Sequence, residues 1–407
     1  MPLVQPSMET EQVSIQSTVW HVITCEYPPQ SGGVSDYTFL VARGLASQGD
    51  AVHVWCPTVR EKAPAVAGVD VHAMLGRFSI RDLRNLGRGL DSFPRPRRLL
   101  VQWVPHGFGL KAINLPFCLW LRHRAVRHGD EVDLMLHEPF LPFVPGRWRQ
   151  NAAAVVQRFM TRIMLRAARR VFLSTPAWEK VVRPYDWNRE RKYAWLPLPS
   201  TVPTVDDPAA SASLRERYQT SSVLLGHFGT FGPPITPMLR AIIPPLLRRT
   251  PDAGMVLIGP GSSAFRESLL HEFPELERAL FAIGQIDARD PRLSLHLSAC
   301  DLLVQPYPDG VTSRRTTMMA ALAHGRPTIS TSGPFTESIW KESGAVVLAA
   351  AGDTEAFVDS ALRLIENPGA RALLGEAGRA FYRRQFDIEH VVELLRRSDF
   401  VEELGVR

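Results

Sequence analysis

Cysteine, long apolar runs and signal segments are scarce or absent in this sequence of 407 residues, and each absence narrows the class of protein. No stretch approaches the ~20 uninterrupted apolar residues of a membrane-spanning helix. The polar N-terminus lacks the basic start and apolar centre of a secretory signal, and we expect its first residues to form a loose tail. Four scattered cysteines without metal-ligand spacing predict buried free thiols and a reducing, cytoplasmic location: Cys25, Cys56, Cys118 and Cys300.

Signatures of nucleic-acid binding are also missing, although the chain is basic, with a net charge of +6 and a pI of about 9.3. No helix-turn-helix, zinc-finger or RNA-binding pattern occurs, so no nucleic-acid partner is expected. Arginine causes the positive charge and is concentrated between Arg77 and Arg170. Two interpretations stay open: a solvated basic surface, or a surface through which the protein associates peripherally with an anionic membrane, at its inner face.

Alternating strand and helix patterns predict the fold class. A strand candidate at 19–25 leads through a turn-rich loop to helical spacing over 36–48, closed by Gly49, and then to a strand at 51–57. Such a βαβ unit, repeated, implies an α/β protein with parallel sheets covered by helices on both faces. The alternation restarts after residue 218 with strands at 223–229 and 254–261 and helices over 238–249 and 266–280.

The length exceeds what one hydrophobic core usually supports, and a change of composition places the domain boundary. Residues 196–218 are rich in Pro, Ser, Ala and Asp and have no apolar period. We predict one Rossmann-like domain over 1–197, a linker over 198–218 and a second Rossmann-like domain over 219–385. Ligands bind beyond the C-terminal ends of strands in such sheets, so the cleft between the domains is the expected site.

Three loops of the N-terminal half carry candidate residues. Gly32 and Gly33 lie between a strand and a helix, where glycine lets the backbone approach a ligand and the helix N-terminus offers free N–H groups. The loop is neither a GxGxxG fingerprint nor a Walker loop, and a tight turn is the alternative. His137, at a strand end, either contacts substrate or bonds to the backbone.

Glu138 follows His137, and a further strand end carries Gln102 and His106. The same positional argument applies to the second loop, although its proline and glycine turns alone explain it.

The loop 305–331 is the most informative part of the sequence. Thr312 or Ser313 is expected to cap a helix that runs to residue 324. Arg314 and Arg315 would then sit in its first turn, where cations oppose the helix dipole unless an anion binds there too. Two arginines and free helix amides predict a diphosphate site, with two solvent-facing arginines as the alternative.

Two segments resemble the signatures of glycosyltransferase family 4, the retaining enzymes of the GT-B fold. They are YPPQSGGVSDYTFLVARGLASQGDAVHVWCP, and SACDLLVQPYPDG through AALAHGRPTISTSGPFTES. The resemblance implies two Rossmann-like domains facing across a cleft, the first on the acceptor side and the second binding a nucleotide-diphosphate sugar. It also implies a terminal helix over 386–407 that crosses back to the first domain. The implied reaction is transfer of a hexose to an unidentified acceptor, with no cofactor beyond the donor. His137 matches the family histidine that faces the transferred sugar, and Glu337 matches a further loop glutamate.

The chain departs from the family pattern in its donor loop. The two spaced glutamates of the family are replaced by Thr312 and Ala320, and the basic pair expected in GTFGPPITP is missing. No Asp-x-Asp pair occurs in a suitable loop, so arginines and helix amides, rather than a metal, are expected to meet the leaving-group charge. The predicted site consists of His137 and Arg314 as catalytic residues, Gly32, Gly33, Gly229, Thr230, Asp309, Thr312, Ser313, Arg314, Arg315, Thr316 and Glu337 on the donor side, and Gln102, His106 and Glu138 on the acceptor side.

These departures keep three hypotheses open. The first is a retaining glycosyltransferase, the second another GT-B nucleotide-sugar enzyme such as an epimerase, and the third a catalytically inactive binding module with this fold.

Overall fold

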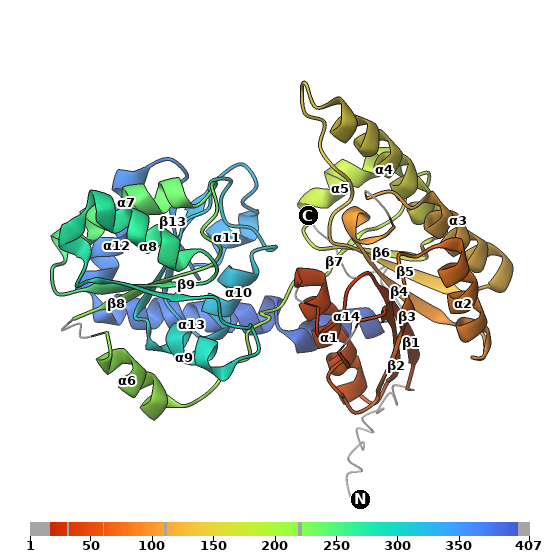
Figure 1. Cartoon of the computed structure of the whole chain (residues 1–407), viewed down its shortest axis with the longest axis horizontal. Helices are drawn as coiled ribbons and strands as arrows, with labels where there is room; N and C mark the ends of the chain where they lie inside the picture. Colours follow the sequence, from red (N-terminus) through yellow and green to blue (C-terminus); the bar gives the residue numbers. More distant parts are fainter. Residues whose placement is uncertain (1–16, 31, 60, 110–111, 219–221, 398–407) are drawn as a thin grey trace, which may run out of the picture.

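The computed structural model describes residues 17–30, 32–59, 61–109, 112–218 and 222–397, and it consists of two α/β lobes joined by a narrow connection (Figure 1). The N-terminal tail expected from the sequence lies outside these residues, as does the end of the expected terminal helix, 398–407. Each lobe contains one parallel sheet with helices on both faces, which confirms the predicted α/β class with two Rossmann-like domains.

The N-terminal domain is built on seven parallel strands in the order β3-β2-β1-β4-β5-β6-β7. The central strands are buried along nearly their whole length, because helices cover both faces of a parallel sheet. The strands are β1 (Val19–Thr24), β2 (Ala51–Pro57), β3 (Val69–Leu75), β4 (Arg98–Trp103), β5 (Glu131–Leu136), β6 (Arg170–Leu173) and β7 (Ala194–Trp195).

Five α-helices accompany this sheet in the described part of the domain. One face is packed by α2, α3 and α4, and the other by α1 together with a helix from the end of the chain. Local signals set their starts: Ser79 and Asp82 form a capping box before α2, and Asn114 caps α3. The helices are α1 (Gly33–Ser47), α2 (Ile80–Asp91), α3 (Leu115–His123), α4 (Trp148–Ala167) and α5 (Ala177–Val182).

The C-terminal domain repeats the design with six parallel strands in the order β10-β9-β8-β11-β12-β13. Helices α7, α8 and α12 pack one face, and α9, α10 and α13 the other. The strands are β8 (Leu224–Phe228), β9 (Gly254–Ile258), β10 (Leu280–Gly284), β11 (Leu302–Gln305), β12 (Thr328–Ser332) and β13 (Val347–Ala350). The helices are α6 (Pro208–Glu216), α7 (Thr236–Arg249), α8 (Ser262–Glu272), α9 (Pro291–Ala299), α10 (Thr316–Ala323), α11 (Ser338–Glu342), α12 (Thr354–Glu366) and α13 (Pro368–Gln385).

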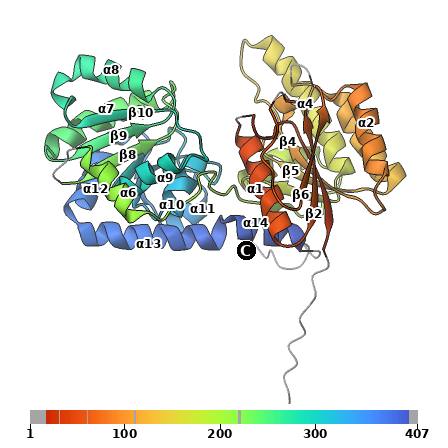
Figure 2. The ribbon, with the colours of Figure 1, turned by 60° about the horizontal axis from the view of Figure 1, so that its bottom comes forward.

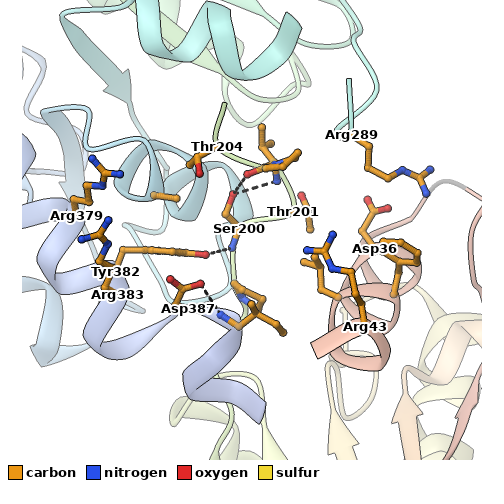
Figure 3. A pocket seen from close by; sticks show the side chains of 17 residues that line it. Asp36, Arg43, Ser200, Thr201, Thr204, Arg289, Arg379, Tyr382, Arg383 and Asp387 are labelled. Atoms are coloured by element: carbon orange, nitrogen blue, oxygen red, sulfur yellow. Dashed lines mark hydrogen bonds between the residues drawn. The ribbon is translucent and has the colours of Figure 1, made fainter. Parts of the chain in front are cut away.

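The chain passes between the domains twice. The first crossing follows β7, and the second joins α13 to α14 (Ile388–Arg396), which packs on α1 of the N-terminal domain (Figure 2). A hydrogen bond of 3.0 Å from the Ser200 amide to the Tyr382 hydroxyl connects the two crossings. Figure 3 shows this region, with Asp36 and Arg43 of α1 facing the crossings from the N-terminal domain.

Helices α6, α8 and α1 have boundaries that differ from the sequence-based expectation. Helix α6 lies inside the segment expected to be an irregular linker, because Asp207 caps it and Pro208 occupies its first position. Helix α8 starts four residues before the expected 266 and ends at Glu272, since Pro274 cannot continue it. Helix α1 begins at Gly33, three residues before the expected 36.

The four cysteines are free and buried, as predicted. Burial raises the pKa of the Cys25, Cys56 and Cys300 thiols to about 12 and raises that of Cys118 further. Within the described ranges, every helix is too short or too polar to cross a membrane.

Candidate active-site cleft

Two cavities meet between the domains, beyond the C-terminal ends of the strands. The larger has a volume of about 500 Å³ and is lined mostly by the C-terminal domain, and the smaller, of about 410 Å³, mostly by the N-terminal domain. We call them the donor-side and acceptor-side cavities. They share five lining residues, which mark their junction: Gly32, Gly33, Thr201, Arg314 and Thr316.

The donor-side cavity is formed by strand ends and by the start of α10. Gly229 and Thr230 follow β8, as the sequence predicts for a site at this edge. Thr316 and Thr317 open α10, and in the described structure their backbone amides have no hydrogen-bond partner. Free amides and the positive end of the helix dipole make this helix start suitable for an anion.

The expected cap of α10 is wrong. The helix begins at Thr316 with Arg315 in the N-cap position, so Arg314 and Arg315 precede the first turn instead of forming it. Thr312 and Ser313 do not cap it, because the Ser313 hydroxyl and amide are both bonded to Glu337.

The two arginines point to different partners. The Arg314 guanidinium donates to Glu138 at 3.0 Å, across the cleft, and lies 4.9 Å from the centre of the Trp178 ring. Arg315 pairs with Asp309 in its own loop and lies over Tyr307. Both side chains are about one-third exposed, so solvent and ligands compete for them. Arg314 lines both cavities, whereas Arg315 lines only the donor side.

Four predicted donor-side residues lie outside the lining of both cavities: Asp309, Thr312, Ser313 and Glu337. The Glu337 carboxylate accepts hydrogen bonds from Ser313, from Trp340 and, at 2.8 Å, from Thr175 of the N-terminal domain. Glu337 and Ser313 therefore support the loop, and Glu337 also joins the two domains, because their polar groups are bonded within the protein.

The glycine loop lies at the junction of the two cavities, and part of its helix start is bonded within the protein. Glu26 Oε1 accepts hydrogen bonds of 3.0 Å from the amides of Val34 and Ser35, the second and third residues of α1, so these two N–H groups are not free. A Cβ on Gly32 would lie 2.2 Å from the same carboxylate oxygen, so a larger residue at this position would displace the Glu26 side chain from these amides. Gly32 and Gly33 line both cavities, and Gly33 is the first residue of α1.

His137 forms the inner wall of the acceptor-side cavity. The pairing of Trp103 with Leu136 brings the ends of β4 and β5 together, and His137 Nε2 donates to Gln102 Oε1 at 2.7 Å. Burial, assisted by the positive charge of Arg314, lowers the pKa of His137 to about 3. The imidazole is therefore neutral at physiological pH, with the proton on Nε2 and a lone pair on Nδ1.

The other predicted acceptor-side residues lie at the cavity wall or behind it. His106 and Glu138 line the cavity, with His106 Nδ1 3.8 Å from a Glu138 oxygen. Gln102 is fully buried behind His137 and does not line the cavity.

Sequence reasoning missed two buried residues beneath the donor-side cavity, His227 and Gln305. His227 Nδ1 donates to the Val304 carbonyl, and the Gln305 amide donates to the Phe228 carbonyl. The remaining acceptor atoms, His227 Nε2 and Gln305 Oε1, find no partner among the described residues. Gln305 is the last residue of β11 and His227 the next-to-last of β8, and that position was the signal that could have revealed them.

Comparison with known families agrees with this arrangement of two domains and a cleft. A model described as Glycosyltransferase Family 4 matches residues 31–197, and one described as Glycosyl transferases group 1 matches residues 223–367. The chain is a GT-B glycosyltransferase similar to family 4. A search of curated proteins finds no match to the glycosyltransferase sequence.

Solved structures share the fold of this glycosyltransferase at low identity. Sucrose-phosphate synthase from Thermosynechococcus elongatus has a TM-score of 0.65 and 15% identity, over 93% of this chain and 97% of that one. HepE from Anabaena, in complex with UDP-glucose, has a TM-score of 0.62 and 13% identity, over 93% and 98% of the chains. An α,α-trehalose-phosphate synthase (UDP-forming) from Burkholderia vietnamiensis has a TM-score of 0.59 and 14% identity, over 93% and 96%.

Proposed function

We propose that this glycosyltransferase moves a hexose from a nucleotide-diphosphate sugar to an acceptor, with retention of anomeric configuration. The observation that carries the proposal is the junction of the two cavities at Arg314 and Thr316, where a cation and free helix amides face the same space. Donor binding by HepE, whose structure holds UDP-glucose, supports a donor of this class.

The diphosphate is assigned to Arg314 and the start of α10. A departing nucleoside diphosphate gains negative charge in the transition state, and groups fixed near that charge accelerate the step. Arg314 and the amides of Thr316 and Thr317 supply positive charge at this place. With cations and helix amides so placed, we expect activity to survive EDTA.

The sugar is assigned to the space between Arg314 and His137. A neutral His137 can accept a hydrogen bond at Nδ1 from a sugar hydroxyl, because Gln102 fixes the proton on Nε2. The nucleoside is assigned to the part of the donor-side cavity above His227 and Gln305, whose unpartnered acceptors suit N–H or O–H groups of a ligand. Ala320 stands where the family has a glutamate in the donor loop, and it is fully buried. The two unpartnered acceptors lie in the same domain as this replaced glutamate.

The test is a panel of nucleotide sugars that differ in base and in sugar. We expect one donor to raise the melting temperature and to be hydrolysed slowly without acceptor, with NMR showing the released sugar in the donor's anomeric configuration. The Arg314→Ala variant, purified in the same way, serves as the control for donor hydrolysis by contaminating enzymes. An isomerised donor would indicate an epimerase, and neither binding nor turnover with any donor would indicate an inactive module, so either result contradicts the proposal.

A further inference from the structure

The outward face of α4 is apolar where a helix on the surface of a domain is normally polar. Trp148, Val155 and Phe159 recur at helical spacing along this face and are 72%, 57% and 56% exposed. The opposite face carries the residues that pack on the sheet, so the exposed stripe is not needed for the core. In Figure 1, α4 stands at the outer side of the N-terminal domain.

Further exposed apolar side chains extend this stripe into one surface. Phe143, 54% exposed, lies in the loop before α4, and Trp187, 56% exposed, lies beside the end of the helix. The Arg158 guanidinium lies 4.0 Å from the centre of the Phe143 ring, and those of Arg162 and Arg166 lie 4.2 and 3.9 Å from a ring of Trp187. We call the whole surface the α4 face; it comprises Leu141, Phe143, Trp148, Val155, Phe159 and Trp187 with Arg147, Arg149, Arg158, Arg162 and Arg166.

The charge of the α4 face has one sign. No acidic residue occurs in the sequence between Glu138 and Glu179. In the part of the chain that the structure describes, none of the five arginines of this face has a carboxylate partner within ion-pair distance. The two nearest carboxylates in sequence after α4 are used elsewhere, Glu179 by Arg183 and Asp186 by Arg191.

Other arginines of the basic stretch are buried in ion pairs. They therefore do not belong to the exposed basic surface expected from the sequence. Arg97 and Arg124 are buried against Asp130, and Arg170 is buried against Asp133. These charges are neutralised inside the domain and contribute little to an external field. Exposed arginines of α2 and α3, such as Arg84, Arg88 and Arg122, also lack a carboxylate within ion-pair distance among the described residues, but on α4 such arginines lie together with exposed aromatic rings.

We propose that the α4 face docks on the surface of an anionic lipid bilayer. Aromatic and aliphatic side chains of such a face enter the boundary between headgroups and acyl chains, while arginines contact anionic headgroups. The presence of both apolar side chains and arginines favours a lipid surface over a purely polar ligand. A solvated polyanion would contact the arginines but would not bury the apolar stripe. It also distinguishes this face from an ordinary solvated surface, since exposed aromatic residues gathered on one helix mark an interaction site.

The experiment is co-sedimentation of the full chain with vesicles. One set consists of phosphatidylcholine alone, and the other of equal parts of phosphatidylcholine and phosphatidylglycerol. We expect sedimentation only with the anionic vesicles, and release at high salt, because the Debye length falls from ~8 Å at 0.15 M to ~3 Å at 1 M. Equal sedimentation with both sets, or with neither, would overturn the proposal.

Two double variants test the two halves of the face. Arg162→Gln with Arg166→Gln should weaken binding by roughly twentyfold to thirtyfold, at about fivefold for each arginine. Trp148→Ser with Phe159→Ser should weaken it by about tenfold or more at unchanged charge. Phe143→Ser, in the loop, provides a second apolar test that leaves the helix intact.

The matched control is Leu373→Ser with Arg363→Gln, an exposed apolar residue and an exposed arginine on the C-terminal domain. This variant should sediment like the parent protein, and an equal loss would remove the assignment to α4. Circular dichroism melting shows whether each variant is folded. Self-association that depends on Trp148 and Phe159, without vesicle binding, would assign the face to a second copy of the chain and overturn the lipid proposal.

Discussion

Arginine–carboxylate pairs differ sharply between the interior of the N-terminal domain and the cleft. Inside the domain, the fully buried Asp133 accepts hydrogen bonds from Arg98 and Arg170 at 2.6–3.0 Å. In the cleft, Arg314 pairs with a Glu138 that is 46% exposed. A buried pair cannot exchange its partner without leaving a charge unsolvated, whereas a half-exposed pair can exchange its carboxylate for a phosphate. Burial thus separates arginines that stabilise the fold from arginines that can bind ligand.

The largest effect is expected from breaking the buried cluster. Asp133→Ala leaves two buried guanidinium groups without their carboxylate, and should cost about 3–5 kcal/mol in the free energy of unfolding. Urea denaturation followed by circular dichroism measures it. Asp309→Ala, which removes the exposed partner of Arg315, is the control and should cost less than about 1 kcal/mol. Equal losses of unfolding free energy in the two variants would contradict the difference between buried and exposed pairs.

Removing the cleft arginine should affect turnover instead of stability. Arg314→Ala should cost about 2–4 kcal/mol in transition-state stabilisation, or roughly two to three powers of ten in kcat, because a charge that meets the leaving group is lost. Steady-state kinetics with the donor found in the panel provides the measurement.

Arg315→Ala is the matched variant, since Arg315 borders only the donor side and is held by Asp309. Its kcat should fall much less. Near-normal activity in both variants would show that the diphosphate is held elsewhere.

Lowering the pH separates buried histidines from buried arginines. The histidines gain a charge in acid, whereas the arginines are charged at every pH tested. Burial lowers the pKa of His137 to about 3 and those of His227 and His324 to about 4, all below the ordinary histidine value of 6.5. The unfolded chain therefore binds more protons between these values. Stability is fully present above pH 6.5 and declines as the pH falls toward 3, which melting temperatures across that range will show. A flat profile would contradict the burial of neutral histidines.

The smallest effect is expected from Glu138→Gln, which breaks the cleft pair without removing Arg314. An exposed pair contributes less than about 1 kcal/mol, so the melting temperature should hardly move. Nucleoside diphosphate should bind up to about fivefold more tightly, because it no longer competes with a carboxylate. Calorimetric titration measures this, and weaker binding would mean that Glu138 positions Arg314 rather than competing for it.

The sequence predicted the elements whose local signals agree with their packing. Strands β1, β2, β8 and β9 are short, mostly apolar runs, with a histidine in all but β9, and their positions were clear because both faces of each sheet are covered. Helix α6 was missed because none of its residues is buried, so no apolar period marks it, although Asp207 and Pro208 form a normal helix start.

The site was harder to predict than the fold, because side chains from distant segments compete for the same groups. The start of α10 was misplaced because Ser313, a good cap by residue type, is bonded to Glu337, 24 residues later in the chain. Two of the amides expected to be free at α1, those of Val34 and Ser35, are taken by Glu26 for the same reason. Position at a strand end did bring His137 and Glu138 to the cleft, since that placement follows from the fold itself, and Arg314 reaches the same cavity from the loop before α10.

The two chain crossings between the domains limit how the cleft can open. Both crossings lie at one place, and the Ser200–Tyr382 hydrogen bond joins them. A translation of either domain would stretch both crossings, whereas a rotation about the line through them changes only a few backbone angles. We therefore expect the cleft to open by hinge rotation about these crossings. Such a rotation would separate Arg314 from Glu138, and closure would bring the cation and the helix amides back to His137.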